Sequence, residues 1–425
     1  MSLSNGRVDH SASGAPRLAT VVSDMARSDC SGSRKRTCLQ AQRSNETHRP
    51  PGVILMKKLS RLWLSAIKKA GKVQRKQLLD FLSPTSPRSK TSSIRKPKTA
   101  PRGASASTSE VTVTSAVHHV PATTHSLQYR LCLPKPTPSE LPLIVMLHGC
   151  QQNAADFAQG TRMNAHAAKH GFAVLYPEQS LRAHPHRCWR WYAQDAQKGE
   201  GDVALVASLI QEILKTHPID PQRIYVCGIS AGAAMAHLLA LTHPELIAAV
   251  ALHAAPVSGV CSNAAGAYSV MQHGSLRASA AAKRALSRFP RTAALPAILI
   301  GGTDDKIVRP VNQRQLLEQF LLLNQTQSLT EQPPRETPYG RTSKKQPRRR
   351  IVATRDYLRG RKLIIRSVLI EGLGHAWSGG DTTLSYNAAG PDATRLVVDF
   401  FSRHRLEPGM KSNTLVTRTT EKRGS

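Results

Sequence analysis

Apolar residues along this chain gather into short runs that alternate with segments of helical periodicity, beginning at about residue 111. The run LIVML at 143–147 has no polar interruption, which is typical of a strand buried on both faces of a sheet. Similar apolar runs follow, and they predict further strands at 172–176, 223–227, 246–252, 297–300 and 363–370.

Segments of helical character separate these runs. In 201–216, for example, Val203, Val206 and Leu209 recur at the spacing of one helix face. The predicted helices are 154–170, 201–216, 233–241, 310–323 and 393–403, with a small-residue loop before residue 297. Repeated strand-helix order predicts an α/β fold, in which a mostly parallel central sheet carries helices on both faces. Functional sites in such sheets lie beyond the carboxyl ends of the strands.

The chain divides by composition into three parts. Residues 1–110 are rich in Ser, Arg, Lys, Pro and Thr, which predicts a disordered basic region. Residues 111–408 form the predicted folded domain, with a basic insertion at about 328–358, and 409–425 are a predicted disordered tail.

One segment of the N-terminal region, 56–82, has a regular apolar pattern that the rest of the region lacks. Its apolar residues, including Leu59, Leu62 and Trp63, fall on one helix face and its lysines and arginines on the other. Such a basic amphipathic helix can lie on an anionic surface or dock on the protein's own core, and both alternatives stay open. Lysines and arginines interrupt any apolar centre, so we do not expect a secretion signal here. Met56 is an alternative start of translation.

The chain is strongly basic. It has 59 Lys and Arg against 27 Asp and Glu, a formal charge of +32, which raises the hypothesis of an anionic partner such as nucleic acid or lipid. Much of this charge lies in the segments not expected to fold, so solvated tails are the simpler interpretation and no specific nucleic acid is expected. No apolar run approaches the roughly 20 residues of a membrane-spanning helix.

The seven cysteines are too few and too scattered for a disulfide scaffold. Cys227 ends a predicted strand, where a small buried thiol is expected. One or two bridges are possible among the cysteines in or beside the folded domain, but spacing does not determine the pairing or the redox compartment. These residues are Cys132, Cys150, Cys188 and Cys261.

The pattern G-x-S-x-G at 228–232 carries the first chemical signal, because a predicted strand precedes it and a predicted helix follows it. Leaving a strand and entering a helix within about two residues forces a strained backbone, and the glycines on either side allow the chains to pass. This turn would expose the hydroxyl of Ser230 beside the free N–H groups of the helix. Ser230 is therefore the predicted nucleophile.

A serine hydroxyl needs an imidazole to accept its proton and a carboxylate to hold that imidazole. Beyond the strand ending at residue 300 lie Asp304 and Asp305, and beyond the strand ending at 370 lies His375. We predict Asp305 as the acid, with Asp304 as the competing choice; either carboxylate could instead be a turn or cap residue. His375 is the predicted base, and His148 is expected to hold the loop after its strand.

The developing oxyanion needs two N–H donors. The backbone amides of Cys150 and Ala231 are the predicted pair, because the loop after 143–147 should lie beside the strand that leads to Ser230. A nucleophilic Cys150 thiol is the competing idea, but no histidine pairing singles it out.

Six motifs give the chain a specific resemblance. They are L-H-G-C-x-Q at 147–152, G-T-R-M-N at 160–164, Y-P-E-Q at 176–179, C-W-R-W-Y at 188–192, G-I-S-A-G at 228–232 and G-H-A-W-S-G-G at 374–380. Over roughly 124–405 they resemble the catalytic domain of the polyhydroxybutyrate (PHB) depolymerase family of esterases, which is related to feruloyl and acetylxylan esterases. The resemblance implies an α/β-hydrolase fold and a secreted serine esterase without metal or organic cofactor, acting on short-chain polyhydroxyalkanoates or similar esters. It also implies Ser230, Asp305 and His375 as a triad and the Cys150 amide in the oxyanion hole.

Several alternatives stay open at this point. The tryptophans Trp189, Trp191 and Trp377 could line an apolar substrate groove or simply pack a lid. A feruloyl or acetylxylan esterase is the alternative activity. A protein that binds granules, membranes or polyanions, with an incidental hydrolase fold, is the alternative of another class. The resemblance suggests an extracellular enzyme, with the cytoplasm as the alternative location.

Overall fold

The computed structural model describes residues 111–120, 126–291, 293–342 and 349–406. The predictions for residues 1–110, including the amphipathic helix at 56–82, and for the tail at 409–425 lie outside these described residues.

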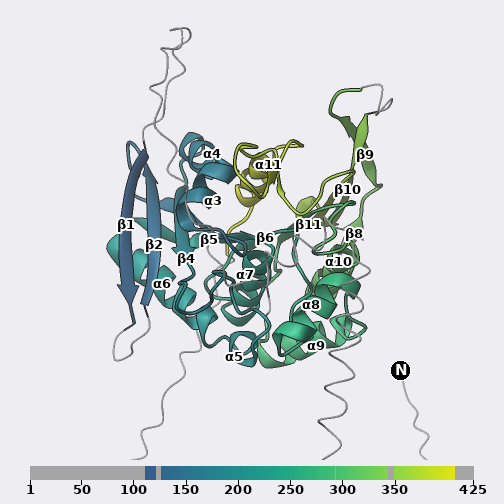
Figure 1. The fold of residues 1–425 in the computed structure, drawn as a ribbon, viewed down its shortest axis with the longest axis horizontal. Coiled ribbons are helices and arrows are strands. Elements are labelled where there is room, and N and C mark those ends of the chain that lie inside the picture. The colour runs from purple at the N-terminus through teal and green to yellow at the C-terminus, as the bar shows by residue number, and fades with distance from the viewer. Residues whose placement is uncertain (1–110, 121–125, 292, 343–348, 407–425) are drawn as a thin grey trace, which may run out of the picture. The chain divides into compact units, whose positions relative to one another are not determined.

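A central sheet organises the described chain (Figure 1). Its middle six strands run parallel, in the spatial order β4 (Ala173–Glu178), β3 (Leu141–Leu147), β5 (Ile219–Ile229), β6 (Ala249–His253), β7 (Ala297–Gly302) and β11 (Lys362–Ile370). The loop after β3 therefore does lie beside the strand that leads to Ser230, because β3 pairs with β5.

Antiparallel strands extend the sheet at both ends. On one side β2 (Ser126–Pro134) pairs with β4, and β1 (Val111–His119) pairs with β2. On the other side β10 (Arg350–Arg359) pairs with β11, and both β8 (Thr330–Glu331) and β9 (Arg335–Tyr339) pair with β10. A separate parallel pair joins β12 (Trp377–Ser378) to β13 (Asn387–Ala388).

Helices cover both faces of the sheet, which confirms the predicted fold class (Figure 1). One face carries α3 (Ala154–Thr161), α4 (Met163–Lys169) and α11 (Ala393–Phe401). The other carries α6 (Asp202–Thr216), α7 (Ala231–Thr242), α8 (Ala264–His273), α9 (Ala278–Arg288) and α10 (Val311–Leu323), with the short α5 (Gln194–Gln197) and η1 (Gln325–Gln327) nearby.

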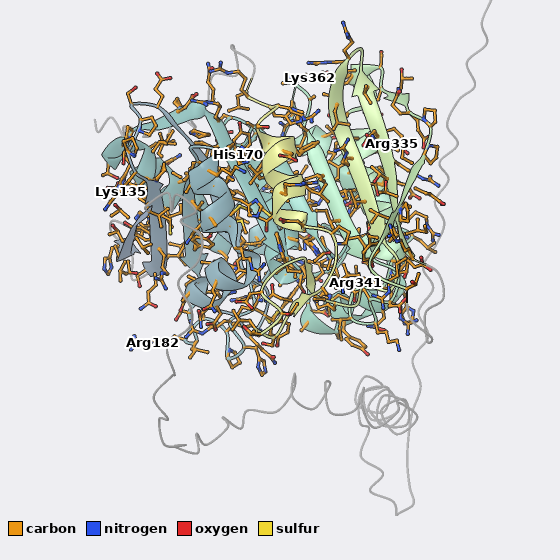
Figure 2. All side chains as sticks on the ribbon, turned by 90° about the horizontal axis from the view of Figure 1, so that it is seen from above. Lys135, His170, Arg182, Arg335, Arg341 and Lys362 are labelled. Carbon is orange, nitrogen blue, oxygen red and sulfur yellow. A yellow bond between two sulfur atoms is a disulfide. The ribbon has the colours of Figure 1, made fainter. Side chains whose placement is uncertain are left out.

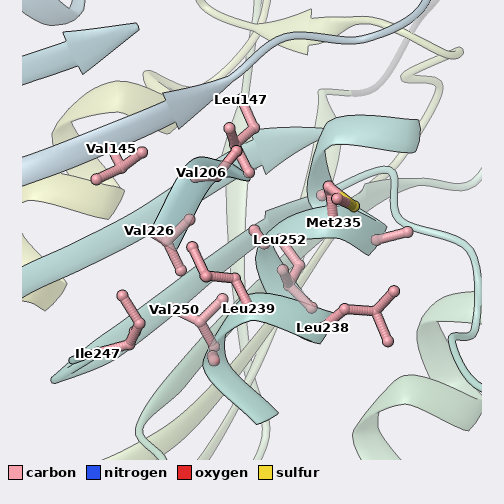
Figure 3. Packing of buried hydrophobic residues seen from close by; sticks show 14 of the residues in the cluster. Val145, Leu147, Val206, Val226, Met235, Leu238, Leu239, Ile247, Val250 and Leu252 are labelled. Atoms are coloured by element: carbon pink, nitrogen blue, oxygen red, sulfur yellow. The ribbon is translucent and has the colours of Figure 1, made fainter. Parts of the chain in front are cut away.

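Alternation along the strands divides the core into two layers. In β5, Ile224 and Val226 belong to the layer under α6 and α7, whereas Tyr225 belongs to the layer under α11. Tyr225 stacks on Phe401 with ring centroids 4.8 Å apart. Figure 3 shows the layer under α6 and α7, where Leu239 of α7 packs against the buried strands. All seven residues of β3 are buried, as expected for a strand covered on both faces.

Three expectations need correction. The helix predicted at 154–170 is two helices, because Arg162 adopts a left-handed conformation (φ 56°) that ends α3. The expected small-residue loop contains α8 and α9, and the alanines that suggested a loop form the buried side of α9. The antiparallel strands at the two ends of the sheet were also missing from the prediction.

The segment expected as an insertion continues the sheet. β9 and β10 pair from Arg350 opposite Tyr339 to Thr354 opposite Arg335. Within the ranges that the structure describes, no helix combines the length and apolarity needed to cross a bilayer.

Candidate active site

Ser230 occupies a sharp turn between β5 and α7. Its backbone has φ 56° and ψ −123°, a strained conformation for a residue with a side chain. The Ser230 amide donates to the carbonyl of His253 over 2.9 Å, which ties the turn to the neighbouring strand β6. The turn thus holds the serine at the carboxyl edge of the sheet.

Close backbone contacts explain the two glycines around Ser230. A Cβ on Gly228 would lie 2.4 Å from the carbonyl of Gly232, and one on Gly232 would lie 2.1 Å from the Leu147 oxygen. No side chain fits at either position, because these contacts are to backbone atoms that cannot move aside. The same contacts press the start of α7 against the end of β3.

Asp305 and His375 meet at the carboxyl ends of β7 and β11. Asp305 Oδ2 and His375 Nδ1 are 2.8 Å apart. The other Asp305 oxygen accepts hydrogen bonds from the amides of Ile307 and Val308, at 2.9 and 2.8 Å, so the carboxylate is fixed in place. A proton on Nδ1 satisfies Asp305 and leaves His375 Nε2 with a free lone pair.

The two candidate acids have different surroundings. Asp305 is buried and faces His375, whereas the Asp304 carboxylate is exposed and accepts a hydrogen bond from Thr303 Oγ1 over 2.9 Å. The structure therefore brings Asp305, and not Asp304, to the histidine.

Ser230 and His375 lie at the same edge of the sheet, because β5, β6, β7 and β11 are parallel neighbours. Their segments meet through His253, whose carbonyl accepts from the Ser230 amide and whose Nε2 accepts from the Ser378 amide at 3.3 Å. Within the described residues the Ser230 hydroxyl makes no hydrogen bond to His375. In free enzymes such catalytic contacts are often long and tighten only when substrate binds.

His253 is a site residue that the sequence reasoning missed. Its ring stacks on Trp377 with centroids 4.9 Å apart, and burial lowers its pKa to about 3, so it is a neutral hydrogen-bond acceptor at physiological pH. Its position at the carboxyl end of the strand next to β5 was the available signal.

The loop after β3 carries one of the predicted oxyanion donors. His148 is buried and fixes this loop: its Nδ1 lies 2.8 Å from Gly149 O, and its Nε2 accepts from the Gln179 amide at 3.0 Å. Burial lowers the pKa of His148 to about 4, which keeps the ring neutral. The Gly149 amide donates to Gln152 Oε1 over 2.7 Å, which closes the loop on itself. These contacts agree with the expected structural role of His148.

The two predicted donor amides are available. Among the described residues, neither the Cys150 amide nor the Ala231 amide donates to a protein acceptor. Gly232 contacts the carbonyls of Leu147 and His148, so the start of α7 and the loop after β3 are in contact. A negatively charged oxygen near Ser230 would find both N–H groups and the positive end of the α7 dipole.

A disulfide joins Cys150 to Cys188, a pairing that the sequence left open. It ties the loop after β3 to the segment before Trp189 and leaves Cys150 without a thiol. Cys132, Cys227 and Cys261 are free, and burial raises the pKa of the Cys227 thiol, as expected for an inert core residue. Within the described ranges, no three His, Cys, Asp or Glu side chains gather in a way that could hold a metal ion.

The three tryptophans are buried. Trp189, Trp191 and Trp377 are 0%, 3% and 1% exposed. Trp189 Nε1 donates to His148 O and Trp377 Nε1 donates to Thr394 Oγ1, each over 3.1 Å. This burial favours the packing alternative over an exposed substrate groove.

Comparison with known proteins adds independent evidence. A family model described as "Esterase PHB depolymerase" matches residues 127–335. Poly(3-hydroxyalkanoate) depolymerase C of Paucimonas lemoignei is 32% identical over 205 residues, which are 46% of this chain and 48% of that protein. Feruloyl esterase B of Thermothelomyces thermophilus is 29% identical over 144 residues, 33% of this chain and 48% of that protein. The chain thus spans about half the length of these two relatives.

A solved structure supports the fold. The acetyl xylan esterase from Aspergillus awamori superposes with a TM-score of 0.54 at 16% identity, covering 68% of this chain and 99% of that one. At this identity the likeness concerns the fold alone. The matched family region contains Ser230, Asp305 and both predicted oxyanion donors, and over residues 127–335 the chain is similar to the esterase PHB depolymerase family.

Proposed function

We propose that this protein is a serine esterase that hydrolyses carboxylic esters through an acyl-enzyme. His375 Nε2 accepts the proton of the Ser230 hydroxyl as its oxygen attacks the ester carbonyl, while Asp305 holds the imidazole and stabilises the resulting positive charge. The amides of Cys150 and Ala231 bind the tetrahedral oxyanion. His375 then protonates the departing alcohol. A water molecule activated by the same imidazole releases the acid and restores Ser230.

One observation carries this proposal: the 2.8 Å contact between His375 Nδ1 and Asp305 Oδ2 at the sheet edge where the strained Ser230 turn lies. A buried carboxylate that also accepts two backbone hydrogen bonds is held in one orientation. It therefore fixes the imidazole in the tautomer that a general base requires.

For the substrate we propose short-chain polyhydroxyalkanoate esters, that is, polyhydroxybutyrate or its oligomers. The family match and the name of the Paucimonas lemoignei relative support this class. Feruloyl or acetylxylan-type esters are the second candidate, supported by the names of other relatives.

A substrate panel tests the proposal. Wild-type protein is assayed on p-nitrophenyl butyrate, amorphous polyhydroxybutyrate, methyl ferulate and acetylated xylan, with Ser230→Ala as the matched control. We expect hydrolysis of p-nitrophenyl butyrate and polyhydroxybutyrate by the wild type, and a loss of at least about 1,000-fold in Ser230→Ala. Hydrolysis that survives in Ser230→Ala would refute the serine mechanism. A preference for ferulate or acetylated xylan would replace the polyester with the second candidate.

We also propose that the protein works outside the cytoplasm. The Cys150–Cys188 disulfide supports this location, because such bonds persist in oxidising compartments. A protein that only binds granules, membranes or polyanions would be indicated if the wild type hydrolysed none of the four esters yet bound such a surface.

A further inference from the structure

The face formed by β9, β10 and β11 carries several arginines, away from the serine. The strand register sets Arg335 opposite Thr354 and Tyr339 opposite Arg350 on β9 and β10, and sets Thr354 opposite Val368 on β11. Alternate residues point to the same side of a sheet. These strands therefore present arginines on one face together with threonine, tyrosine and valine side chains.

A groove runs along this face. The segment before α11 and the first turn of α11 form its other wall, and it encloses about 640 Å³. Figure 2 shows Arg335 and Arg341 on the same side of the molecule, at the end of the sheet that β9 and β10 form. Its lining contains arginines and no Asp or Glu; the arginines are Arg335, Arg341, Arg350, Arg366 and Arg395.

The arginines differ in how their charge is compensated. Asp356 pairs with Arg335 at 2.6 Å and with Arg366 at 2.7 Å, so one buried carboxylate serves two guanidinium groups. Within the described part of the chain, neither Arg341 nor Arg395 forms an ion pair with a carboxylate. Arg395 lies in the first turn of α11, where its amide donates to the N-capping Asp392 carboxylate over 2.9 Å. The five arginines of the groove therefore outnumber the carboxylates of Asp356 and the nearby Asp392.

Apolar groups lie between these charges. Val352 and Val368 form part of the floor, while Pro391 and Leu396 belong to the wall. A densely charged phosphate polymer would gain little from these surfaces. An anion carried on an aliphatic chain would use both, because its carboxylate can bind guanidinium groups and its methyl and methylene groups can cover the valines.

The groove lies close to the catalytic loops. Tyr339 OH donates to Glu371 O over 2.5 Å, and Ser378 Oγ donates to Pro391 O over 2.7 Å. Ser378 in turn contacts His253, which contacts Ser230. Two buried residues thus connect the wall of the groove to the turn that carries the serine, so the groove and the predicted nucleophile belong to one packed unit.

We propose that the arginine groove binds the free carboxylate end of an oligoester chain, with Arg341 and Arg395 as its main ligands. This inference rests on the proposed esterase function, and it adds a preference for substrates and products that end in an acid. Both residues are binding residues and lie outside the serine mechanism.

Binding measurements without turnover test the proposal. The full chain carrying Ser230→Ala is titrated calorimetrically with the linear trimer of 3-hydroxybutyrate as the free acid, with the methyl ester of the same trimer, and with inorganic pyrophosphate. We expect the acid to bind about tenfold more tightly than the methyl ester, as one charge-assisted contact provides. Adding Arg341→Gln or Arg395→Gln should weaken acid binding about tenfold and leave methyl ester binding unchanged.

A matched control separates a site from general charge. Arg314→Gln removes one exposed positive charge on α10, on the other face of the sheet, and should leave acid binding unchanged. Equal binding of acid and ester, an equal loss in all three arginine variants, or tighter binding of pyrophosphate than of the acid would each overturn the proposal. Because no hydrolysis is measured, failure here is distinct from failure of the esterase, which wild-type hydrolysis of p-nitrophenyl butyrate reports.

Discussion

Ser230 is held by its backbone and by the glycines beside it. The turn depends on Gly232 in particular, since a methyl group there would collide with the carbonyls of Leu147 and His148. These carbonyls precede the loop that carries the Cys150 amide. Any shift at Gly232 therefore moves the predicted nucleophile and oxyanion donors relative to one another.

We predict that Gly232→Ala lowers kcat/KM for p-nitrophenyl butyrate at least about 100-fold, because small displacements of an oxyanion donor cost this much. The thermal midpoint should also fall. Gly374→Ala is the control: it lies beside His375, but a Cβ there meets nothing within 4 Å. Similar activity in the two variants would show that the close contact at Gly232 is unimportant.

Single residues differed in how well the sequence predicted them. Ser230 and His375 stand in motifs at predicted strand ends, so local sequence was sufficient to nominate them. Asp304 and Asp305 are adjacent, and only the three-dimensional course of the loop distinguishes the one that faces His375. His253 was missed because its contacts come from neighbouring strands that are distant in sequence.

At the scale of elements, the loop after β3 is fixed from several directions. His148 and Gln152 hold it internally, and the Cys150–Cys188 disulfide attaches it to the segment 38 residues away. Chain entropy alone gives such a crosslink a stabilising effect of about 4 kcal/mol. The bond thus contributes both to stability and to the position of one donor amide.

We expect the double variant Cys150→Ser, Cys188→Ser to lose both stability and turnover. The midpoint of thermal unfolding should fall, and at a temperature where the variant is still folded kcat should drop about tenfold with a smaller change in KM, because the amide acts on the transition state. Cys261→Ser, which removes a free thiol, is the matched control. An unchanged kcat in the folded double variant would refute a positional role for the disulfide.

Elements with strong periodicity were predictable, and the others were not. The six parallel strands are rich in apolar residues because helices cover both faces of the sheet, so the sequence predicted their positions. β1 is largely exposed and contains no continuous apolar run, so its sequence did not predict a strand. α9 buries only alanines, whose apolar periodicity is weak. The break between α3 and α4 lies at Arg162, which takes a positive φ although it is not a glycine, so its residue type did not predict the break.

For the whole molecule, buried histidines couple folding to pH. Burial lowers the pKa of His237 to about 3, and His148, His253 and His404 are lowered to between about 3 and 4 for the same main reason. The unfolded chain therefore binds more protons than the folded protein below about pH 6.5. Stability should be full above that pH and should fall as the pH decreases toward about 4.

His237→Leu tests this coupling. The His237 ring stacks on Phe320 with centroids 4.8 Å apart, and in the described structure neither ring nitrogen has a hydrogen-bond partner, so leucine should be tolerated at neutral pH. The free energy of unfolding should decrease less between about pH 7 and about pH 4.5 in this variant than in the wild type. His170→Leu, at an exposed position, should keep the wild-type decrease. Identical decreases in all three proteins would contradict this source of pH dependence.

The central claim is that Ser230 is activated by His375 and Asp305 across four strands of one sheet. Labelling with a fluorophosphonate, followed by peptide mapping, tests it most directly, because this reagent traps only an activated serine. We expect one adduct, on Ser230, formed at least about 1,000-fold more slowly in His375→Ala. An adduct on a different serine, or labelling of Ser230 at the wild-type rate in His375→Ala, would contradict the account.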